Sequence, residues 1–153
     1  MEGNNMSKFE QAESWLRRAN NKLKEAKNQL TQRYNYPESV SASQECIELS
    51  IKAMFSVAEV KFTKIHNIKE EEFKNLLDKI PPNLKNIYNY PRIYLLSEFW
   101  SYFYITAKYG LEELKIGSDK LFKEKEAELA LKHAGECYNA SYQFYNELRW
   151  KHD

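Results

Sequence analysis

The chain has 153 residues, the usual size of one domain, and its 23 Lys and Arg residues nearly balance its 22 Asp and Glu residues. This balance excludes the class of proteins that coat nucleic acid or an anionic membrane through a strongly basic surface, so no DNA partner is expected. No run of about 18 uncharged apolar residues occurs, so no membrane span is expected. The two cysteines, Cys46 and Cys137, lie in apolar helical patterns, which predicts buried thiols and a cytoplasmic location.

The first predicted helix begins at a capping box, because Ser7 is followed three residues later by Glu10. Residues 1–6 are expected to be a disordered tail, and residues 7–153 to form the folded domain. Apolar residues then recur at alternating spacings of three and four: Phe9, Ala12, Leu16, Ala19, Leu23, Ala26 and Leu30. This spacing predicts a long helix with one narrow apolar seam, which is typical of a helical bundle. Pro37 marks the break that follows it.

Two further helices are expected before residue 83. Pro37 suits the first turn of a second helix, which the apolar pattern extends to about Thr63. Asn67 and Glu70 form another potential capping box for a short third helix, and the two prolines at 81–82 stop it.

The fourth predicted helix, from Pro91 to Gly110, is unusually aromatic. Nine of the 22 aromatic residues lie between Tyr88 and Tyr109, and they occupy every side of the helical wheel. Such a helix needs its remaining face covered by a second subunit, a ligand or the loop at 111–118. Aromatic residues at helical spacing belong to a core more often than to a base-stacking site. A dimer interface explains the excess, and its predicted residues are Tyr94, Phe99, Trp100, Phe103 and Tyr104.

The last predicted helix runs from about Lys123 to Trp150, and small residues line the first half of its seam. Small seam residues let helix backbones approach closely. No alternation with a period of two is long enough for a strand. The fold class predicted from these patterns is all-α, an up-and-down antiparallel bundle of about five helices in a single domain.

A polar stripe runs along the second helix, where Gln44, Glu48 and Lys52 recur every fourth residue beside an apolar face. One interpretation is structural: Glu48 and Lys52 form an ordinary intrahelical ion pair and Gln44 is a neighbouring polar contact. The other is functional: Lys52 contacts a nucleotide phosphate and Gln44 a base or ribose. His66, in a turn flanked by lysines, either serves an anionic ligand or packs under the turn.

The run 43–55, preceded by the long first helix, resembles the HEPN family of prokaryotic helical-bundle domains. The segments 107–110 and 120–122, followed by the small seam of the last helix, resemble the closing pattern of the same family, and His66 also fits. The resemblance covers residues from about 9 to about 148.

This resemblance implies an antiparallel bundle of about five helices, commonly a symmetric dimer, with roles in nucleotide binding beside nucleotidyltransferases or as toxin ribonucleases. The ribonuclease branch carries an Arg and a His separated by about four to six residues, so that both converge on a scissile phosphate. This chain lacks that motif, because its only close pair is Arg149 with His152. It also has Lys108 where the family's arginine is expected, and lysine lacks the bidentate phosphate grip.

The leading hypothesis is therefore a non-catalytic protein that dimerises and binds a nucleotide, a nucleotidyltransferase partner, or both. Its candidate nucleotide-binding residues are Gln44, Glu48, Lys52, His66, Arg92 and Lys108. The alternative is a divergent toxin ribonuclease of a toxin–antitoxin pair that uses His66 or His133. No catalytic residue, metal ligand or cofactor is assigned, because no nucleophile with a base and no set of ligands at metal spacing can be assembled.

Overall fold

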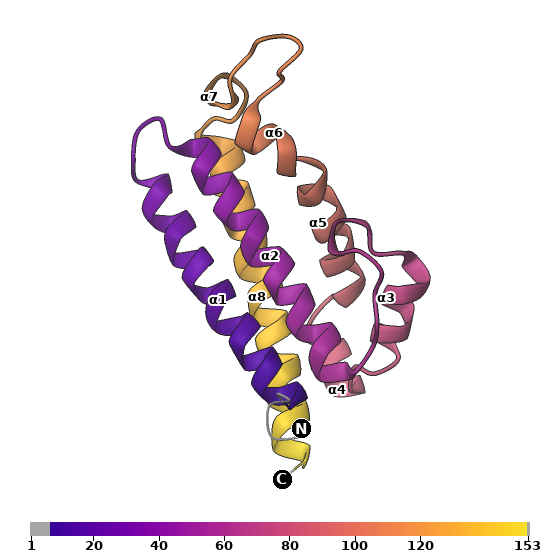
Figure 1. Cartoon of the computed structure of the whole chain (residues 1–153). Coiled ribbons are helices and arrows are strands. Elements are labelled where there is room, and N and C mark those ends of the chain that lie inside the picture. The colour runs from indigo at the N-terminus through magenta and orange to yellow at the C-terminus, as the bar shows by residue number, and fades with distance from the viewer. Residues whose placement is uncertain (1–6, 153) are drawn as a thin grey trace, which may run out of the picture.

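Three long helices, α1, α2 and α8, form the main body of the protein (Figure 1). The computed structural model describes residues 7–152, with the side chains of residues 7–150, so the expected tail at 1–6 lies outside the described residues. The helices in chain order are α1 (Lys8–Leu30), α2 (Tyr36–Ala58), the 3-10 turn η2 (Ile65–Asn67), α3 (Glu70–Leu77), α4 (Pro82–Lys85), α5 (Tyr90–Tyr102), α6 (Tyr104–Tyr109), α7 (Ser118–Leu121) and α8 (Glu124–His152).

The long elements alternate in direction along the chain. Figure 1 shows α1 running from the end that carries the N-terminus to the opposite end, α2 returning, α5 and α6 rising again, and α8 returning to the first end. The short elements η2, α3 and α4 form the crossover between α2 and α5. The all-α prediction is confirmed. The five-helix count is approximate, because the third expected helix is only the short α3 and the fourth is divided into two.

Local backbone geometry explains where the helices end. Ser7 caps α1 as expected, because its hydroxyl accepts a hydrogen bond from the Glu10 N–H at 3.1 Å. Helix α2 ends at Ala58, before the expected Thr63, because Glu59 adopts the left-handed conformation with φ 56°. The aromatic helix is interrupted at Phe103, whose φ of −92° and ψ of 4° separate α5 from α6.

The start of α3 also differs from the sequence prediction. The expected capping box of Asn67 and Glu70 does not form the cap, because Asn67 belongs to the 3-10 turn. Instead, Glu72 Oε1 accepts a hydrogen bond from the Lys69 N–H at 3.0 Å, and Glu72 Oε2 accepts one from the Thr63 N–H at 2.7 Å. These hydrogen bonds lower the pKa of Glu72. The cap therefore begins two residues later and also ties the loop after α2 to α3.

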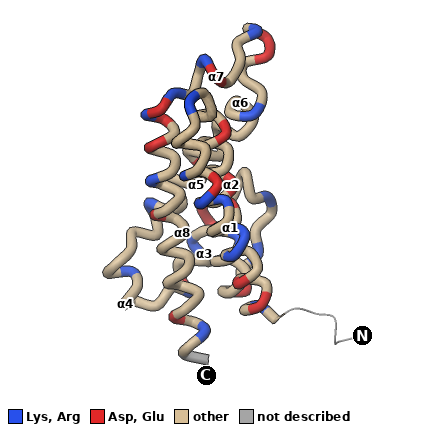
Figure 2. The backbone as a smooth tube through the Cα atoms, turned by 90° about the vertical axis from the view of Figure 1, so that its left-hand side faces the viewer, with Lys and Arg blue, Asp and Glu red and all other residues tan. Residues whose placement is uncertain are grey.

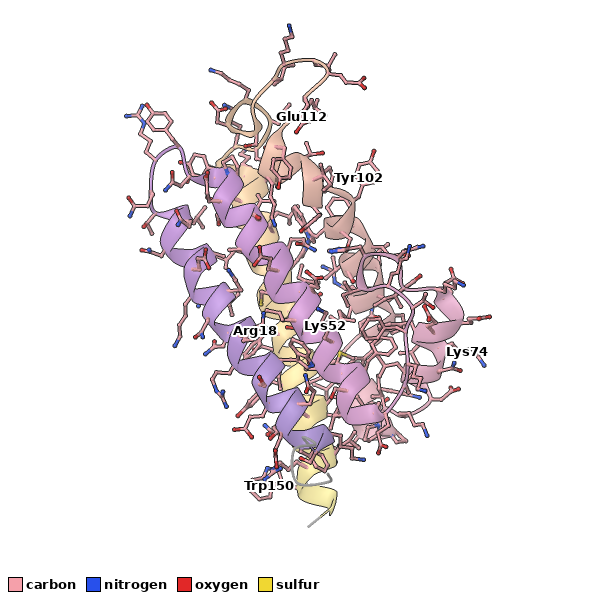
Figure 3. All side chains as sticks on the ribbon, in the orientation of Figure 1. Arg18, Lys52, Lys74, Tyr102, Glu112 and Trp150 are labelled. Atoms are coloured by element: carbon pink, nitrogen blue, oxygen red, sulfur yellow. The ribbon has the colours of Figure 1, made fainter. Side chains whose placement is uncertain are left out.

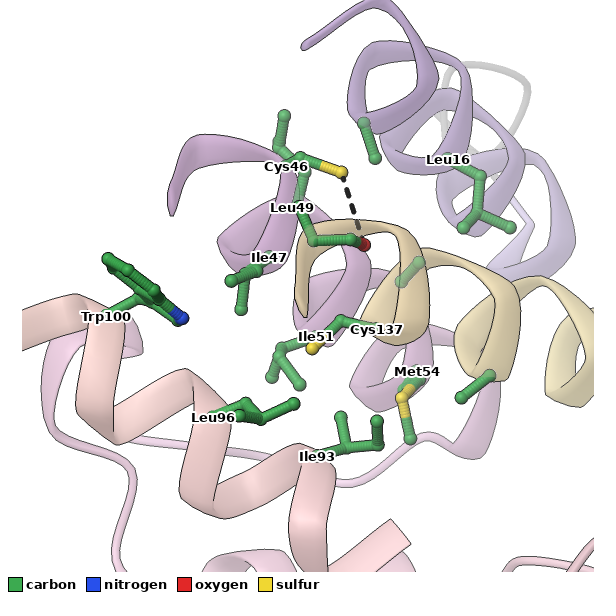
Figure 4. Close-up of a cluster of buried hydrophobic side chains, with 14 of the residues drawn as sticks. Leu16, Cys46, Ile47, Leu49, Ile51, Met54, Ile93, Leu96, Trp100 and Cys137 are labelled. Carbon is green, nitrogen blue, oxygen red and sulfur yellow. Dashed lines mark hydrogen bonds between the residues drawn. The ribbon is translucent and has the colours of Figure 1, made fainter. Parts of the chain in front are cut away.

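Helix α2 lies at the centre of the fold, in contact with α1, α5, α6 and α8. The seam of α8 consists of fully buried small residues: Ala127, Ala130, Ala134, Cys137 and Ala140. Because small side chains let backbones approach, Cys46 Sγ of α2 reaches the Ala134 carbonyl of α8 at 3.9 Å (Figure 4). Ile51 of α2 and Ile93 of α5 lie on the other side of this contact region, around Cys137. One continuous core thus joins both sides of the bundle.

Charged residues of both signs are interspersed along the backbone (Figure 2). Within residues 7–152, no helix is long and apolar enough to cross a membrane.

Candidate ligand-binding and docking surfaces

Helix α2 is buried on nearly every side, but one strip of its surface is partly exposed. The strip consists of Ser41, Glu45, Glu48, Lys52 and Ser56. Their spacing of three or four residues is that of neighbours on one helix face. The polar stripe expected from the sequence shares Glu48 and Lys52 with this strip, whereas Gln44 lies beside it and is only 3% exposed.

At the α6 side of the strip, charged and aromatic groups form a connected cluster. We call it the α2–α6 cluster, and it comprises Glu45, Glu48, His66, Tyr104 and Lys108. Glu48 Oε1 lies 3.3 Å from His66 Nε2, and the His66 ring lies 4.6 Å from the Tyr104 ring, centroid to centroid. Lys108 Nζ donates a hydrogen bond to Tyr104 Oη at 3.2 Å and lies 3.8 Å from Glu45 Oε1. The cluster contains three of the six predicted nucleotide-binding residues.

The bases of this cluster are neutralised by acids of the same chain. The hydrogen bond to Tyr104 raises the pKa of Lys108, and Glu45 adds to the effect. Lys22 of α1 lies 3.1 Å from the other oxygen of Glu45, and the hydrogen bond to that carboxylate raises the pKa of Lys22. Each basic side chain here has a carboxylate partner within 4 Å, so an incoming phosphate would have to compete with Glu45 and Glu48.

Gln44 lies one helical turn before Glu48 and has an incomplete set of hydrogen bonds. Its Oε1 atom is buried and has no hydrogen-bond partner among the described residues. A buried polar atom without a partner is costly. Gln44 therefore marks the polar flank of α2, but its burial separates it from a ligand on the surface.

At the α1 side of the strip, Lys52 faces an aromatic cleft. The cleft has a volume of about 400 Å³, and we call it the Trp15 cleft; it is lined by Trp15, Lys52, Phe55, Ser56, Val60, Lys61 and Phe62. Lys52 Nζ lies 5.1 Å from the centroid of the Trp15 ring, and Arg18 Cζ lies 5.3 Å from it. Figure 3 labels Arg18 on α1 and Lys52 on α2, the two neighbouring helices that carry the Trp15 cleft.

Arg92 is not brought together with the other predicted nucleotide-binding residues. Its Nε donates a hydrogen bond to Glu136 Oε2 of α8 at 2.7 Å, so its head group belongs to the contact between α5 and α8. Asn89 caps α5 beside it by accepting a hydrogen bond from the Arg92 N–H at 3.1 Å. The structure thus divides five of the predicted residues among the α2–α6 cluster, the Trp15 cleft and the α5–α8 contact, and it buries the sixth, Gln44, beside the strip.

His133 lies between α5 and α8, and its ring is nearly buried. Trp100 Nε1–H donates a hydrogen bond to His133 Nδ1 at 3.0 Å, so this nitrogen acts as the acceptor and carries no proton. Burial lowers the pKa of His133, the nearby positive charges of Arg92 and Lys132 lower it further, and Glu136 opposes them. His133 is therefore a neutral structural side chain in the core.

The outer side of α5, α6 and the following loop exposes many apolar side chains. We call this surface the apolar face, and its members are Leu95, Phe99, Tyr102, Ile105, Leu111 and Leu114, together with Leu129 of α8. Tyr102 is the extreme case, with 81% of its surface exposed, and Figure 3 shows it pointing outward. A hollow of about 400 Å³ lies within this face, and the rings of Phe99, Phe103 and Phe122 contribute to its walls.

The five predicted dimer-interface residues have different environments. Phe99 is exposed, whereas Trp100 is only 3% exposed and belongs to the core. The Tyr94 hydroxyl donates a hydrogen bond to the Ile68 carbonyl at 2.8 Å, and Tyr104 packs on His66. Phe103 is partly buried against Phe122. The fold itself thus covers much of the aromatic helix, and the exposed remainder includes residues outside the predicted set.

Chemistry that depends on cysteine or on a metal receives no support from the side chains. Burial raises the pKa of the Cys46 thiol to about 12 and that of Cys137 well above its usual value, so neither thiol is activated. No group of three or more potential metal ligands from His, Cys, Asp and Glu occurs within the part of the chain that the structure describes.

Sequence reasoning missed Trp15, Glu45 and Lys22. Glu45 lies three residues before Glu48 on the same helix face, and this spacing was a usable signal. Trp15 and Lys22 come from another helix, and no local pattern in α2 could have identified them.

Comparison with known proteins gives one match. A family model described as HEPN domain matches residues 12–144. No curated protein and no solved structure matches the chain.

Proposed function

The chain belongs to the HEPN family, and from this premise we propose that it is a binding module that pairs with a second copy of itself through the apolar face and takes a nucleotide as its ligand. The proposal assigns no chemical step to the chain. The observation that carries it is the apolar face, because soluble proteins rarely leave so many neighbouring apolar side chains in water unless the surface binds a partner.

Pairing explains why the side chains of the apolar face are left exposed in a single chain. A two-fold contact would lay the exposed side chains of this face against those of a second copy. A nucleotidyltransferase, which the family resemblance implies as a partner, is the alternative occupant of the same face.

Sedimentation of the purified protein tests the pairing. We expect a species of twice the 18.2 kDa chain mass and its conversion to the monomer by the double substitution Tyr102→Ser and Ile105→Ser. Tyr34→Ser is the matched control, because Tyr34 is also exposed but lies at the turn after α1. A wild-type protein that remains at 18.2 kDa at high concentration would exclude self-pairing and leave the heterologous partner.

Nucleotide binding is supported by the partly exposed strip of α2, where lysines lie beside aromatic rings on both flanks. Ammonium groups hold phosphates, and aromatic faces stack on bases. A ligand at about 100 times its Kd stabilises the folded state by about 2.7 kcal/mol, which raises the Tm of a chain of this length by roughly 5–10 °C. A panel of nucleotides that leaves the Tm unchanged would end this part of the proposal.

The ribonuclease alternative is favoured by one observation, the contact between Glu48 and His66. A carboxylate can orient an imidazole for acid–base work on a phosphodiester, and Lys108 lies nearby. His133 is unsuited to this task because it is nearly buried and bonded to Trp100. Incubation with structured RNA decides between the two functions: cleavage that His66→Ala abolishes supports the enzyme, and intact RNA supports the binding module.

A further inference from the structure

The basic side chains near α2 fall into two groups. Lys22, Lys108 and His66 each have a carboxylate partner within 4 Å. Arg18, Lys52 and Lys61, at or beside the Trp15 cleft, have no carboxylate partner within 4 Å in the described part of the chain. Three unneutralised cations around one hollow create a local positive potential that favours an anion.

The walls of the Trp15 cleft add a second requirement to the ligand. A molecule that enters it meets the indole of Trp15 on α1, the ring of Phe55 on α2 and the ring of Phe62 on the loop that follows. Phe55 and Phe62 already pack edge to face, with centroids 5.0 Å apart, so these rings form a stable apolar wall. Such walls favour a flat ring.

Lys52 can exchange its present contact for a ligand. Its Nζ rests over the Trp15 ring, and a cation–π contact at an exposed site is weak compared with a charge-assisted hydrogen bond to an anionic oxygen. The flexible four-carbon stem of lysine allows this movement without a change in the backbone. Lys61 lines the same cleft, so two ammonium groups are available to one anionic group.

We propose that the Trp15 cleft is a ligand site for a small aromatic anion, with the ring against Trp15 and Phe62 and the phosphate or carboxylate on Lys52 and Lys61. The inference deepens the proposed nucleotide binding and rests on it for the nucleotide as the form of the ligand. It moves the site away from the α2–α6 cluster, which contains three of the six candidate residues, to the opposite edge of the same helix.

The test distinguishes binding of the aromatic ring from binding of the anionic group. Full-length protein is titrated with ATP, with inorganic triphosphate, with adenosine and with indole-3-acetate, and the indole N–H signals of Trp15, Trp100 and Trp150 are followed by NMR. We expect ATP to shift the Trp15 signal and leave the buried Trp100 signal in place. Triphosphate and adenosine should each bind at least about tenfold more weakly, because each satisfies only half of the site.

Charge variants locate the site. The double substitution Lys52→Gln and Lys61→Gln is expected to weaken ATP binding by at least about tenfold, because both charge-assisted contacts are lost. Lys74→Gln with Lys79→Gln removes the same charge from the exposed surface at α3 and should leave the affinity unchanged. Both pairs are partly or fully exposed, so we expect all variants to fold.

Each outcome separates this inference from the proposed function. ATP binding that survives in the Lys52/Lys61 variant but disappears in Lys108→Gln would overturn the Trp15 cleft and keep nucleotide binding. Binding of indole-3-acetate without ATP would keep the cleft and overturn the nucleotide. A Trp15 signal that no compound moves would overturn the cleft outright, and absence of any ATP binding would overturn the proposed nucleotide as well.

Discussion

The body formed by α1, α2 and α8 and the segment from α5 to α7 differ in how fully one chain can cover them. In the body, small residues at the seam of α8 lie against α2, and hydroxyl groups complete the contact: Ser141 Oγ donates to the Ser50 carbonyl at 2.7 Å, and Ser39 Oγ donates to the Ala26 carbonyl at 2.8 Å. In the segment, Tyr102 and Ile105 point into solvent.

This difference distinguishes residues that pack within the chain from residues that are available to a partner. The contacts of α2 with α1 and α8 are completed within a single chain, so the residues at these contacts are under a packing constraint. The α5–α7 segment has one packed side and one exposed side. The apolar side chains of the exposed side contribute to stability only when a partner buries them. Substitutions of apolar side chains should therefore affect stability where they lie in the core of the body and association where they lie on the exposed side of the segment.

The largest effect on the free energy of unfolding is expected in the core of the body. Ile51 is fully buried, and Ile51→Ala should lower the free energy of unfolding by about 2–5 kcal/mol, because it removes buried methyl groups and leaves a cavity. Ile105 is 56% exposed, and Ile105→Ala should change the free energy of unfolding of the dilute protein by no more than about 0.5 kcal/mol. Urea unfolding with matched slopes measures both.

The same two variants distinguish the body from the segment further when the protein concentration is varied. If the apolar face is buried in a dimer, the loss of unfolding free energy in Ile105→Ala should increase with protein concentration, because association stabilises the folded state by mass action. Equal costs for Ile51→Ala and Ile105→Ala in dilute protein would show that the segment is no less packed than the body.

A second prediction uses two glycines, one in each region. Gly110, which ends α6, has φ +72°, and a Cβ there would lie 2.2 Å from the Ile116 carbonyl oxygen. Gly110→Ala should therefore strain the turn closed by Leu111 and Ile116 and cost about 1–3 kcal/mol. Gly135→Ala in α8 meets no atom within 4 Å and should stabilise the protein by about 0.4–1 kcal/mol.

Thermal unfolding shows whether each substitution raises or lowers the stability, and amide exchange shows which part of the structure is affected. Faster exchange at Leu111 and Ile116 in Gly110→Ala, with α8 unaffected, would confirm that the strain stays within the segment. Two substitutions that both stabilise the protein would refute the assignment of a glycine-specific conformation to position 110.

Periodicity predicted the body well because it reports which face of a helix is buried. The spacing of Ala12, Leu16 and Ala19, and the small seam around Ala134, needed no knowledge of partners. Helix ends were harder, because the left-handed turn at Glu59 leaves no signal in the apolar pattern.

The candidate site was predicted only in part, for the same physical reason. Spacing placed Glu48 and Lys52 on one face of α2, but the partners of that face come from distant segments. His66 pairs with Glu48, whereas Lys52 turns to Trp15 of α1. Whether a lysine is neutralised depends on tertiary contacts, so the sequence could not show that Lys108 is paired and Lys52 is not.

The smallest effect is expected at the hydrogen bond from Trp100 of α5 to His133 of α8, which connects the two regions. The pKa of His133 is lowered in the folded chain from its ordinary value of 6.5, so below about pH 6.5 the unfolded chain binds a proton that the folded chain does not. This contribution to stability is fully present above pH 6.5 and is lost as the pH falls toward the lowered pKa. The loss should be smaller than the cost of a cavity in the core, because only one side chain changes its protonation.

His133→Gln isolates this contribution, because a glutamine oxygen can accept the Trp100 hydrogen bond and does not titrate. Urea unfolding at several pH values from 7.5 down to about 5 should show a steeper loss of stability in the wild type than in the variant, since only the wild type has a histidine that protonates on unfolding. Parallel curves for the two proteins would mean that His133 is as easily protonated in the folded chain as in the unfolded one, and the packed side of α5 would then be more open to water than the body.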